Sequence, residues 1–213
     1  MAFSQKLFDA IVSGKPPLAQ SIVEEELADG ADPLTLVSET MIPAMDEVGI
    51  LFRDEEFFVP ELMLSGRAMK AAMEPLRPLL AAAGAEPLGV IVAGTVKGDL
   101  HDIGKNLVIS MLEGSGFKVH DLGTDVTPQE FVEAIRELQP QILCLSALLT
   151  VTMTAMKTTI EAIHEAGLRR SVKILVGGAP LSERYAKEIG ADGYGATAID
   201  AVTLARRQVG LAN

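Results

Sequence analysis

Asp99 and His101 are the residues whose types and spacing point most directly to chemistry. They lie two positions apart in the segment GTVKGDLHDIGKN, residues 94–106, which follows the apolar run LGVIVA. A histidine that binds a metal usually donates its second ring N–H to a carboxylate, which fixes the tautomer and strengthens the ligand. One histidine is too few for a zinc or iron site made by protein side chains alone. If His101 binds a metal, the other ligands must arrive with it, as in a macrocycle. The alternative is a histidine that only pairs with a nearby aspartate.

Other ligand-binding loops fit this segment less well. A nucleoside-triphosphate loop has four residues between its first glycine and the Gly-Lys pair. Here five residues separate Gly98 from Gly104, and Asn106 stands where a hydroxyl residue is needed. The aspartates of the segment would also repel phosphate. The dinucleotide pattern G-x-G-x-x-G is absent, and Ser146 stands where a phospho-acceptor protein of this fold class would need a carboxylate.

The composition indicates a folded, acidic protein. The chain has 213 residues, 48% of them hydrophobic, and a net charge of −11, which argues against nucleic acid and anionic membranes as partners. The first 86 residues carry 15 acids and 6 bases, and this acidic excess is a solvated surface or a docking face for a basic partner. The single cysteine, Cys144, excludes a disulfide within the chain. We see no signal peptide and no apolar stretch of about 18 residues, so we expect a cytoplasmic protein.

Residues 1–84 read as helices only and predict a four-helix bundle. Ser4 caps the first helix, and Pro16 opens the second. The third begins at Pro33 and is expected to kink at Pro43, and the fourth begins at Pro60. The stretch AAAGAEP, residues 81–87, reads as a linker.

From residue 88 to 213 the pattern changes to short apolar runs that alternate with amphipathic stretches. The runs are LGVIVA, KVHDLG, QILCLS, VKILVG and a weak GYGA. Continuous apolar strands between helices predict a parallel sheet covered on both faces. We therefore expect an α/β fold: a helical domain at 1–84, and at 88–213 a doubly wound, flavodoxin-like (Rossmann-like) domain with five parallel strands. Ligands of such sheets bind beyond the carboxyl ends of the strands, where residues 94–106 lie.

Three motifs in order carry a family resemblance. D-x-H-x-x-G is formed by Asp99, His101 and Gly104; S-x-L follows as Ser146 and Leu148, and then the pair Gly177–Gly178. At these separations the set resembles the cobalamin-binding domain of methionine synthase and of the corrinoid proteins of methyltransferase systems. The segment FFVPELMLSGRAMKAAMEPL, residues 57–76, resembles the fourth helix of that family's helical cap. The resemblance thus covers nearly the whole chain, in the family's domain order.

The resemblance implies cobalamin bound base-off and His-on. His101 would be the lower axial ligand of cobalt, and Asp99 would hydrogen-bond its other ring nitrogen and tune the metal. Gly104, Gly177 and Gly178 would open a slot for the displaced nucleotide arm. Ser146 would bond the base of the arm. The remaining residues expected to touch the cofactor are the loop residues Gly98, Asp102 and Ile103, then Leu148, one of Thr150 and Thr152, and Gly195 or Ala196 beside the last strand.

The resemblance also assigns a role to the helical domain, as a cover for the upper face of the corrin. Phe57, Phe58, Leu62 and Met63 are the residues we place there, and Phe58 best matches the family's capping aromatic. The alternative is that these apolar side chains form the core of the bundle.

The function that the resemblance implies is that of a corrinoid methyl carrier. A substrate-specific methyltransferase would load a methyl group onto cob(I)alamin, and a second would pass it from methylcobalamin to tetrahydrofolate or coenzyme M. An ATP-dependent reductive activator is expected as a further partner. Methylamines, methanol, glycine betaine and methoxylated aromatics are all possible methyl sources. The chain lacks substrate-binding barrel domains, so we expect it to be non-catalytic alone.

Two other functions are compatible with a cobalamin-binding chain. One is a cobalamin-based sensor without a DNA-binding module of its own; the acidic helical domain, which lacks Trp, argues against this reading. The other is the small subunit of an adenosylcobalamin-dependent mutase, and the helical domain argues against it.

Overall fold

The computed structural model describes residues 3–84 and 86–211 and divides into two compact units. The first comprises the chain through Pro87 together with Glu113–Gly116, and the second the rest. Within the described residues, no helix is both long and apolar enough to cross a membrane. The helical unit contains α1 (Gln5–Val12), α2 (Pro16–Ala28), α3 (Pro33–Leu36), a π-helical turn (Val37–Met41), α4 (Ile42–Arg53), α5 (Val59–Met73) and α6 (Arg77–Ala82).

Local capping signals set where these helices begin. The side chain of Ser4 accepts a hydrogen bond from the backbone N–H of Leu7, as the sequence predicts. At the start of α5, the backbone N–H of Phe58 donates to the carboxylate of Glu61 at 3.0 Å. The helix α6 was not predicted, and it extends to Ala82, inside the stretch expected to be a linker. The helical region is thus confirmed, with one short helix more than the sequence indicated.

Pro43 is accommodated by a π turn. Proline has no N–H, and its ring would clash with the carbonyl four residues earlier in a regular α-helix. Here the helical run from Pro33 to Arg53 widens into the π turn at Val37–Met41, directly before Pro43. The local irregularity predicted at Pro43 therefore lies in the turn that precedes it.

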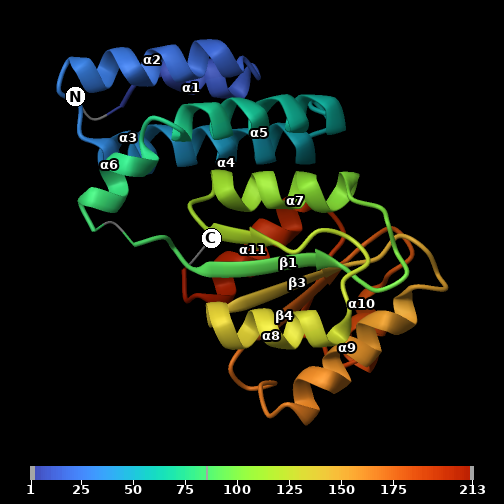
Figure 1. Ribbon diagram of the computed structural model, residues 1–213. Helices are drawn as coiled ribbons and strands as arrows, with labels where there is room; N and C mark the ends of the chain where they lie inside the picture. The colour runs from blue at the N-terminus through green and yellow to red at the C-terminus, as the bar shows by residue number, and fades with distance from the viewer. Residues whose placement is uncertain (1–2, 85, 212–213) are drawn as a thin grey trace. The chain divides into compact units, whose positions relative to one another are not determined.

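The second unit is a five-stranded parallel sheet with strand order β2-β1-β3-β4-β5, as predicted. Helices α7 and α11 cover one face of the sheet, and α8 and α9 cover the other (Figure 1). The order places β1 beside β3. Between these two strands the order in which successive strands are added to the sheet reverses, and ligands bind at this point in folds of this type. The elements are β1 (Val90–Thr95), α7 (Ile103–Gly114), β2 (Lys118–Asp121), α8 (Pro128–Leu138), β3 (Ile142–Ser146), α9 (Met153–Glu165), β4 (Lys173–Gly177), α10 (Glu183–Glu188), β5 (Gly193–Gly195) and α11 (Ala198–Gln208).

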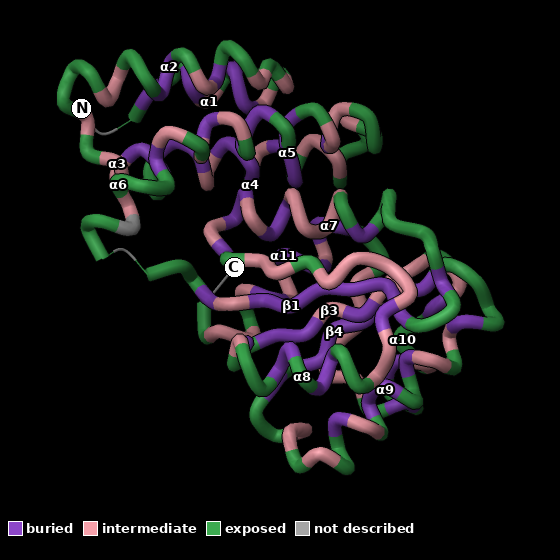
Figure 2. Tube along the Cα trace, viewed as in Figure 1, coloured by how far each residue is buried: buried purple, intermediate pink, exposed green. Residues whose placement is uncertain are grey.

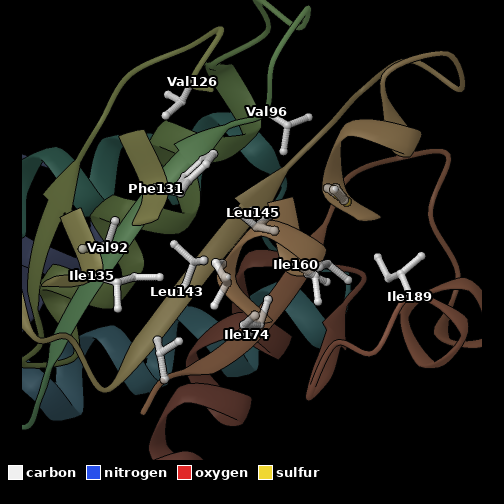
Figure 3. Packing of buried hydrophobic residues seen from close by; sticks show 14 of the residues in the cluster. Val92, Val96, Val126, Phe131, Ile135, Leu143, Leu145, Ile160, Ile174 and Ile189 are labelled. Atoms are coloured by element: carbon white, nitrogen blue, oxygen red, sulfur yellow. The ribbon is translucent and has the colours of Figure 1, made fainter. Parts of the chain in front are cut away.

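The core of this unit lies between the sheet and helices α8, α9 and α10. Alternate strand residues such as Leu143, Leu145 and Ile174 point to this face, where they pack against Phe131 and Ile160 (Figure 3). Burial is concentrated in the strands, whereas much of the loops at their carboxyl ends is exposed (Figure 2). A rigid sheet therefore carries exposed loops at the edge where the predicted site residues lie.

Candidate functional site

Asp99 and His101 form the pair that the sequence predicts. Asp99 is fully buried in the loop after β1. Its Oδ1 lies 2.8 Å from Nδ1 of His101 and accepts the backbone N–H of the same residue at 3.0 Å. The hydroxyl of Thr95, the last residue of β1, donates to the carbonyl of His101 at 2.9 Å. Both the ring and the backbone of His101 are therefore held in place.

The loop between β3 and α9 supplies the donors to the other oxygen of Asp99. The backbone N–H groups of Leu148 and Leu149 donate to Oδ2 at 2.8 and 3.3 Å, and the hydroxyl of Thr152 donates to it at 2.6 Å. Of the two threonines considered from sequence, Thr152 thus reaches Asp99, whereas Thr150 is exposed and makes no such bond among the described residues.

These contacts keep Asp99 ionised. Burial by itself would raise the pKa of its carboxyl group, but hydrogen bonds from Thr152, Leu148 and His101 outweigh this effect and lower the pKa well below its ordinary value of 3.8. A carboxylate only accepts hydrogen bonds, so Nδ1 of His101 must be the donor. The lone pair of the ring therefore lies on Nε2, which is the nitrogen available to a metal.

The surroundings of His101 suit a metal that brings most of its own ligands. The imidazole is about half exposed, with 49% of the side-chain surface accessible. Among the described residues, no group of three or more His, Cys, Asp or Glu side chains could hold a metal ion. Large apolar side chains of the loops after β1 and β3 and of the first turn of α7 are exposed instead, namely Leu100, Leu148, Leu149, Val151 and Ile103. An exposed apolar surface with one free imidazole nitrogen matches a broad apolar ligand that carries a metal.

On the α7 and α11 side of the sheet, small residues line up across the strand ends. Register places Thr95 beside Ser146, Ser146 beside Gly177, and Gly177 beside Gly195. In the next row of this face, Cys144 is only half-buried although it lies on a central strand. A methyl group added at Gly104 would meet no atom within 4 Å. Of the three glycines that the resemblance assigns to a slot, Gly104 is thus the one beside open space.

The two motif glycines at the carboxyl end of β4, Gly177 and Gly178, have different constraints. A Cβ on Gly178 would lie 1.8 Å from the carbonyl oxygen of Ala147, and its φ of +139° is one that other residues rarely adopt. A Cβ on Gly177 would meet only the carbonyl oxygen of Gly195, at 3.2 Å. Gly178 is thus required by the close approach of two loops of the protein itself, which the sequence analysis had attributed to a ligand.

Comparison with known proteins identifies the family of this chain. Residues 4–77 and 89–203 each match a family model described as a B12 binding domain. Trimethylamine corrinoid protein 1 of Methanosarcina acetivorans is 43% identical over 203 residues, covering 94% of each chain. The chain belongs to the family of B12-binding corrinoid proteins. Its cofactor is cobalamin, as the sequence predicts.

Two solved structures of cobalamin-dependent proteins share the fold of this corrinoid-family chain. A cobalamin-binding protein from Desulfitobacterium hafniense is 34% identical with a TM-score of 0.79, and the match covers 96% of this chain and 97% of that one. The methanol:cobalamin methyltransferase complex of Methanosarcina barkeri contains a chain that is 28% identical with a TM-score of 0.85, with 98% and 81% covered. These matches confirm both the predicted family and the predicted architecture.

The residues predicted to cover the corrin lie in different environments within the helical unit. Leu62 is fully buried in the core of that unit. Met63 and Phe57 are half-buried, whereas Phe58 has 62% of its surface exposed. Leu62 is therefore a bundle-core residue, as the alternative interpretation held, and Phe58 is the residue of this group that is most available to a ligand.

The sequence analysis missed two residues that brace the His101 loop. Asp125 accepts the backbone N–H of Gly98 at 2.8 Å, pairs with Lys97 at 3.0 Å, and donates its own N–H to the carbonyl of Asp99 at 2.9 Å. Its φ of 58° is left-handed, a conformation that Asp tolerates better than most residues. Lys105 is buried and donates to both oxygens of Asp121 at 2.6 Å, which anchors the start of α7. Neither contact has a short-range sequence signal, because each joins two segments that are separated in the sequence.

Gly98, Asp102 and Ala196 lie where the sequence analysis expected them, in exposed loops at the carboxyl ends of the strands. Gly98 has a φ of +83° and turns the chain into the His101 loop. Asp102 accepts a hydrogen bond from Asn106 at 3.1 Å, within the first turn of α7. Ala196 follows β5 and is exposed. The geometry is compatible with contacts from these residues to a bound ligand.

Proposed function

We propose that this chain is a corrinoid methyl carrier that binds cobalamin base-off, with Nε2 of His101 as the lower axial ligand of cobalt. The observation that carries the proposal is the bond between Nδ1 of His101 and the buried, ionised Asp99. It leaves one imidazole nitrogen free, with a fixed direction, on an apolar surface. Cobalamin, when bound, supplies a cobalt that accepts a methyl group from one partner and gives it to another.

The protein's own residues hold the ligand in one protonation state. Thr152, Leu148 and Leu149 donate to Oδ2 of Asp99 and so stabilise the carboxylate. The carboxylate in turn keeps a proton on Nδ1 of His101 and raises the basicity of Nε2. The lowered pKa of Asp99 keeps this carboxylate ionised, so that it remains an acceptor for the N–H of His101.

The nucleotide arm of a base-off cobalamin needs a slot, and the α7 and α11 side of the sheet offers one. Ser146, Gly177 and Gly195 lie side by side there, and Gly104 adjoins open space. The hydroxyl of Ser146 is half-buried and makes no hydrogen bond within the described residues, so it is free to bond the arm. Cys144 lies one row deeper on the same face.

The proposed partners follow from the relatives. One relative is a corrinoid protein named for trimethylamine, and one structural match is a methanol:cobalamin methyltransferase complex. We propose that a methyltransferase specific for a small methylated compound loads this chain, and that a second methyltransferase unloads it to tetrahydrofolate or coenzyme M. An ATP-dependent activator would restore oxidised cobalt. The helical unit, through Phe58, would shield the upper face of the corrin from water and oxygen.

Substitution of Gly104 tests the slot without disturbing the protein. Because a Cβ at this position meets nothing within 4 Å, we expect Gly104→Leu to leave the free energy of unfolding of the apoprotein unchanged to within about 1 kcal/mol. Cobalamin affinity, measured by equilibrium dialysis, should fall at least about 100-fold, since a side chain would occupy the arm's path. The control is Ser110→Leu, which lies on the same helix, α7, as Gly104. Gly123→Leu is not a suitable control, because Gly123 has a φ of +85°, which side chains such as Leu rarely adopt. Undiminished cobalamin affinity in Gly104→Leu would exclude the slot.

Reconstitution tests the methyl carrier itself. The purified protein is loaded with hydroxocobalamin, reduced, and incubated with a methylamine and the corresponding methyltransferase. We expect the visible spectrum to show conversion to a methylated corrinoid, and we expect no conversion when the apoprotein is used. A chain that binds cobalamin but accepts no methyl group from any methyltransferase that acts on a small methylated compound would argue for the sensor interpretation.

A further inference from the structure

Tyr185 makes a contact that connects α10 to the start of α9. Its hydroxyl donates to the backbone carbonyl of Met153 at 2.9 Å. Met153 is the first residue of α9, and Thr152, which donates to Asp99, directly precedes it. The ring of Tyr185 packs against the core beside the sheet. The phenol of Tyr185 is thus held in place, and it bonds the backbone carbonyl of the residue that follows Thr152.

Contacts with neighbouring elements hold both ends of the loop that carries Thr152. At its beginning, Ala147 donates to the carbonyl of Gly177 at 3.3 Å and lies against Gly178. At its end, the hydroxyl of Tyr185 on α10 bonds the carbonyl of Met153. Between these two points the loop gives three donors to Asp99. The position of the donors therefore depends on how firmly both ends are held.

We propose that Tyr185 is a positioning residue for the axial ligand. By holding Met153, its hydroxyl places the Thr152 hydroxyl against Asp99, and Asp99 then orients His101. The inference rests on the proposed function, because it concerns the histidine proposed above as the cobalt ligand. Tyr185 touches neither Asp99 nor His101, so it acts only through the loop.

Tyr185→Phe isolates the hydroxyl because it keeps the ring. The chain has one other tyrosine, Tyr194 on β5, whose ring also packs against this core and whose hydroxyl makes no hydrogen bond among the described residues. Tyr194→Phe is therefore the matched control. Each protein is loaded with cobalamin and reduced to the cobalt(II) state, and electron paramagnetic resonance gives the ratio of histidine-off to histidine-on cobalt.

We expect Tyr185→Phe to raise this ratio about 3- to 10-fold, the effect of losing one hydrogen bond, and Tyr194→Phe to leave it unchanged. In a Thr152→Val background, Tyr185→Phe should cause no further change, because the group through which it acts is gone. A ratio in Tyr185→Phe equal to that of the unmodified protein would overturn the proposal. So would an effect of the same size with and without Thr152, which would show that the hydroxyl acts by another route.

Two controls separate the possible failures. If the unmodified protein shows no histidine-on cobalt, the proposed function fails. That failure is then independent of the role proposed for Tyr185. If Tyr185→Phe does not take up cobalamin, hydrogen exchange of the apoprotein tests the positioning role in place of the cobalt spectrum. We expect the backbone amides of residues 147–156 to exchange faster in Tyr185→Phe than in Tyr194→Phe, whereas equal exchange in the two variants would contradict the proposal. A lower melting temperature without either change would indicate a structural role only.

Discussion

At the residue scale, the buried carboxylate of Asp99 joins the loop after β1 to the loop after β3. Its donors are backbone N–H groups, the ring of His101 and the hydroxyl of Thr152. An anion in this position is stable only while its hydrogen bonds are satisfied, because an unpaired buried charge is costly. The same bonds that stabilise the fold therefore also fix the orientation of His101.

Replacing Thr152 with Val tests this link, since Val keeps the shape and removes the hydroxyl. We expect the free energy of unfolding at pH 7 to fall by about 1.5–3 kcal/mol, the range for a hydrogen bond to a charged group. Urea denaturation would measure it. Thr150→Val is the control, because Thr150 is exposed and does not bond Asp99, and it should have almost no effect.

The pH dependence of this difference has a defined sign. The pKa of Asp99 is lower in the folded protein than its ordinary 3.8, so the carboxylate contributes stability above that value and loses it as the pH falls toward the folded pKa. Thr152→Val weakens this contribution. The difference in the free energy of unfolding between the unmodified protein and Thr152→Val should thus be constant from about pH 5 to 8 and become smaller below about pH 4. A gap that widened in acid would contradict the assignment of Asp99 as the ionised partner.

Cys144 reports on the proposed slot. Burial raises the pKa of its thiol to about 12, so the thiol is almost wholly protonated near neutral pH. We expect iodoacetamide to modify the apoprotein slowly, at a rate that rises with pH because the thiolate is the reactive form, and cobalamin to protect the thiol. Mass spectrometry of the alkylated protein would follow the reaction. A rate that cobalamin leaves unchanged would place the arm elsewhere.

At the scale of elements, the loop after β2 supports the loop that carries His101. Asp125 does so through its carboxylate, which bonds Gly98 and Lys97, and through its backbone N–H, which bonds Asp99. Its left-handed backbone adds a further requirement, because Asn tolerates this conformation and Ala does not.

We expect Asp125→Ala to weaken cobalamin binding by roughly tenfold and Asp125→Asn to weaken it less, since Asn keeps an acceptor for Gly98 and suits the backbone. Binding would be measured by titration of the apoprotein with hydroxocobalamin. Affinities equal to that of the unmodified protein in both variants would show that the loop does not depend on this residue. An equal loss of affinity in Asn and in Ala would point to the charge on Asp125, which both variants lack, rather than to its hydrogen bond with Gly98.

At the scale of the whole molecule, the sequence predicted the elements that have local signals. The cap residue Ser4 and the apolar runs of the sheet each place their element through neighbouring residues. The short helix α6 was missed because its six residues are too few to show a helical apolar period. The π turn before Pro43 was anticipated only as a kink, because spacing shows that proline disturbs a helix but not how the chain absorbs it.

The site was predictable where one motif contains both partners, as in Asp99 and His101. The contacts of Asp125, Lys105 and Tyr185 were not, because each residue meets a segment far away in the chain and only the fold brings the two together. At Gly178 the structure adds a requirement that the pattern could not show: the pattern indicates that a side chain is excluded, but not that the protein's own backbone at Ala147 excludes it.

The central claim is that Nε2 of His101 binds cobalt in place of the base of the vitamin. Protein made with ¹⁵N-labelled histidine and loaded with unlabelled cobalamin tests it in the cobalt(II) state, because the nitrogen splitting in the electron paramagnetic resonance spectrum identifies the axial atom. We predict that the spectrum shows the doublets of ¹⁵N and that these doublets are lost in His101→Ala. The spectra of His120→Ala and His164→Ala should keep them. Triplets of ¹⁴N in the labelled protein would show that the vitamin's own base remains on the metal and would contradict the account.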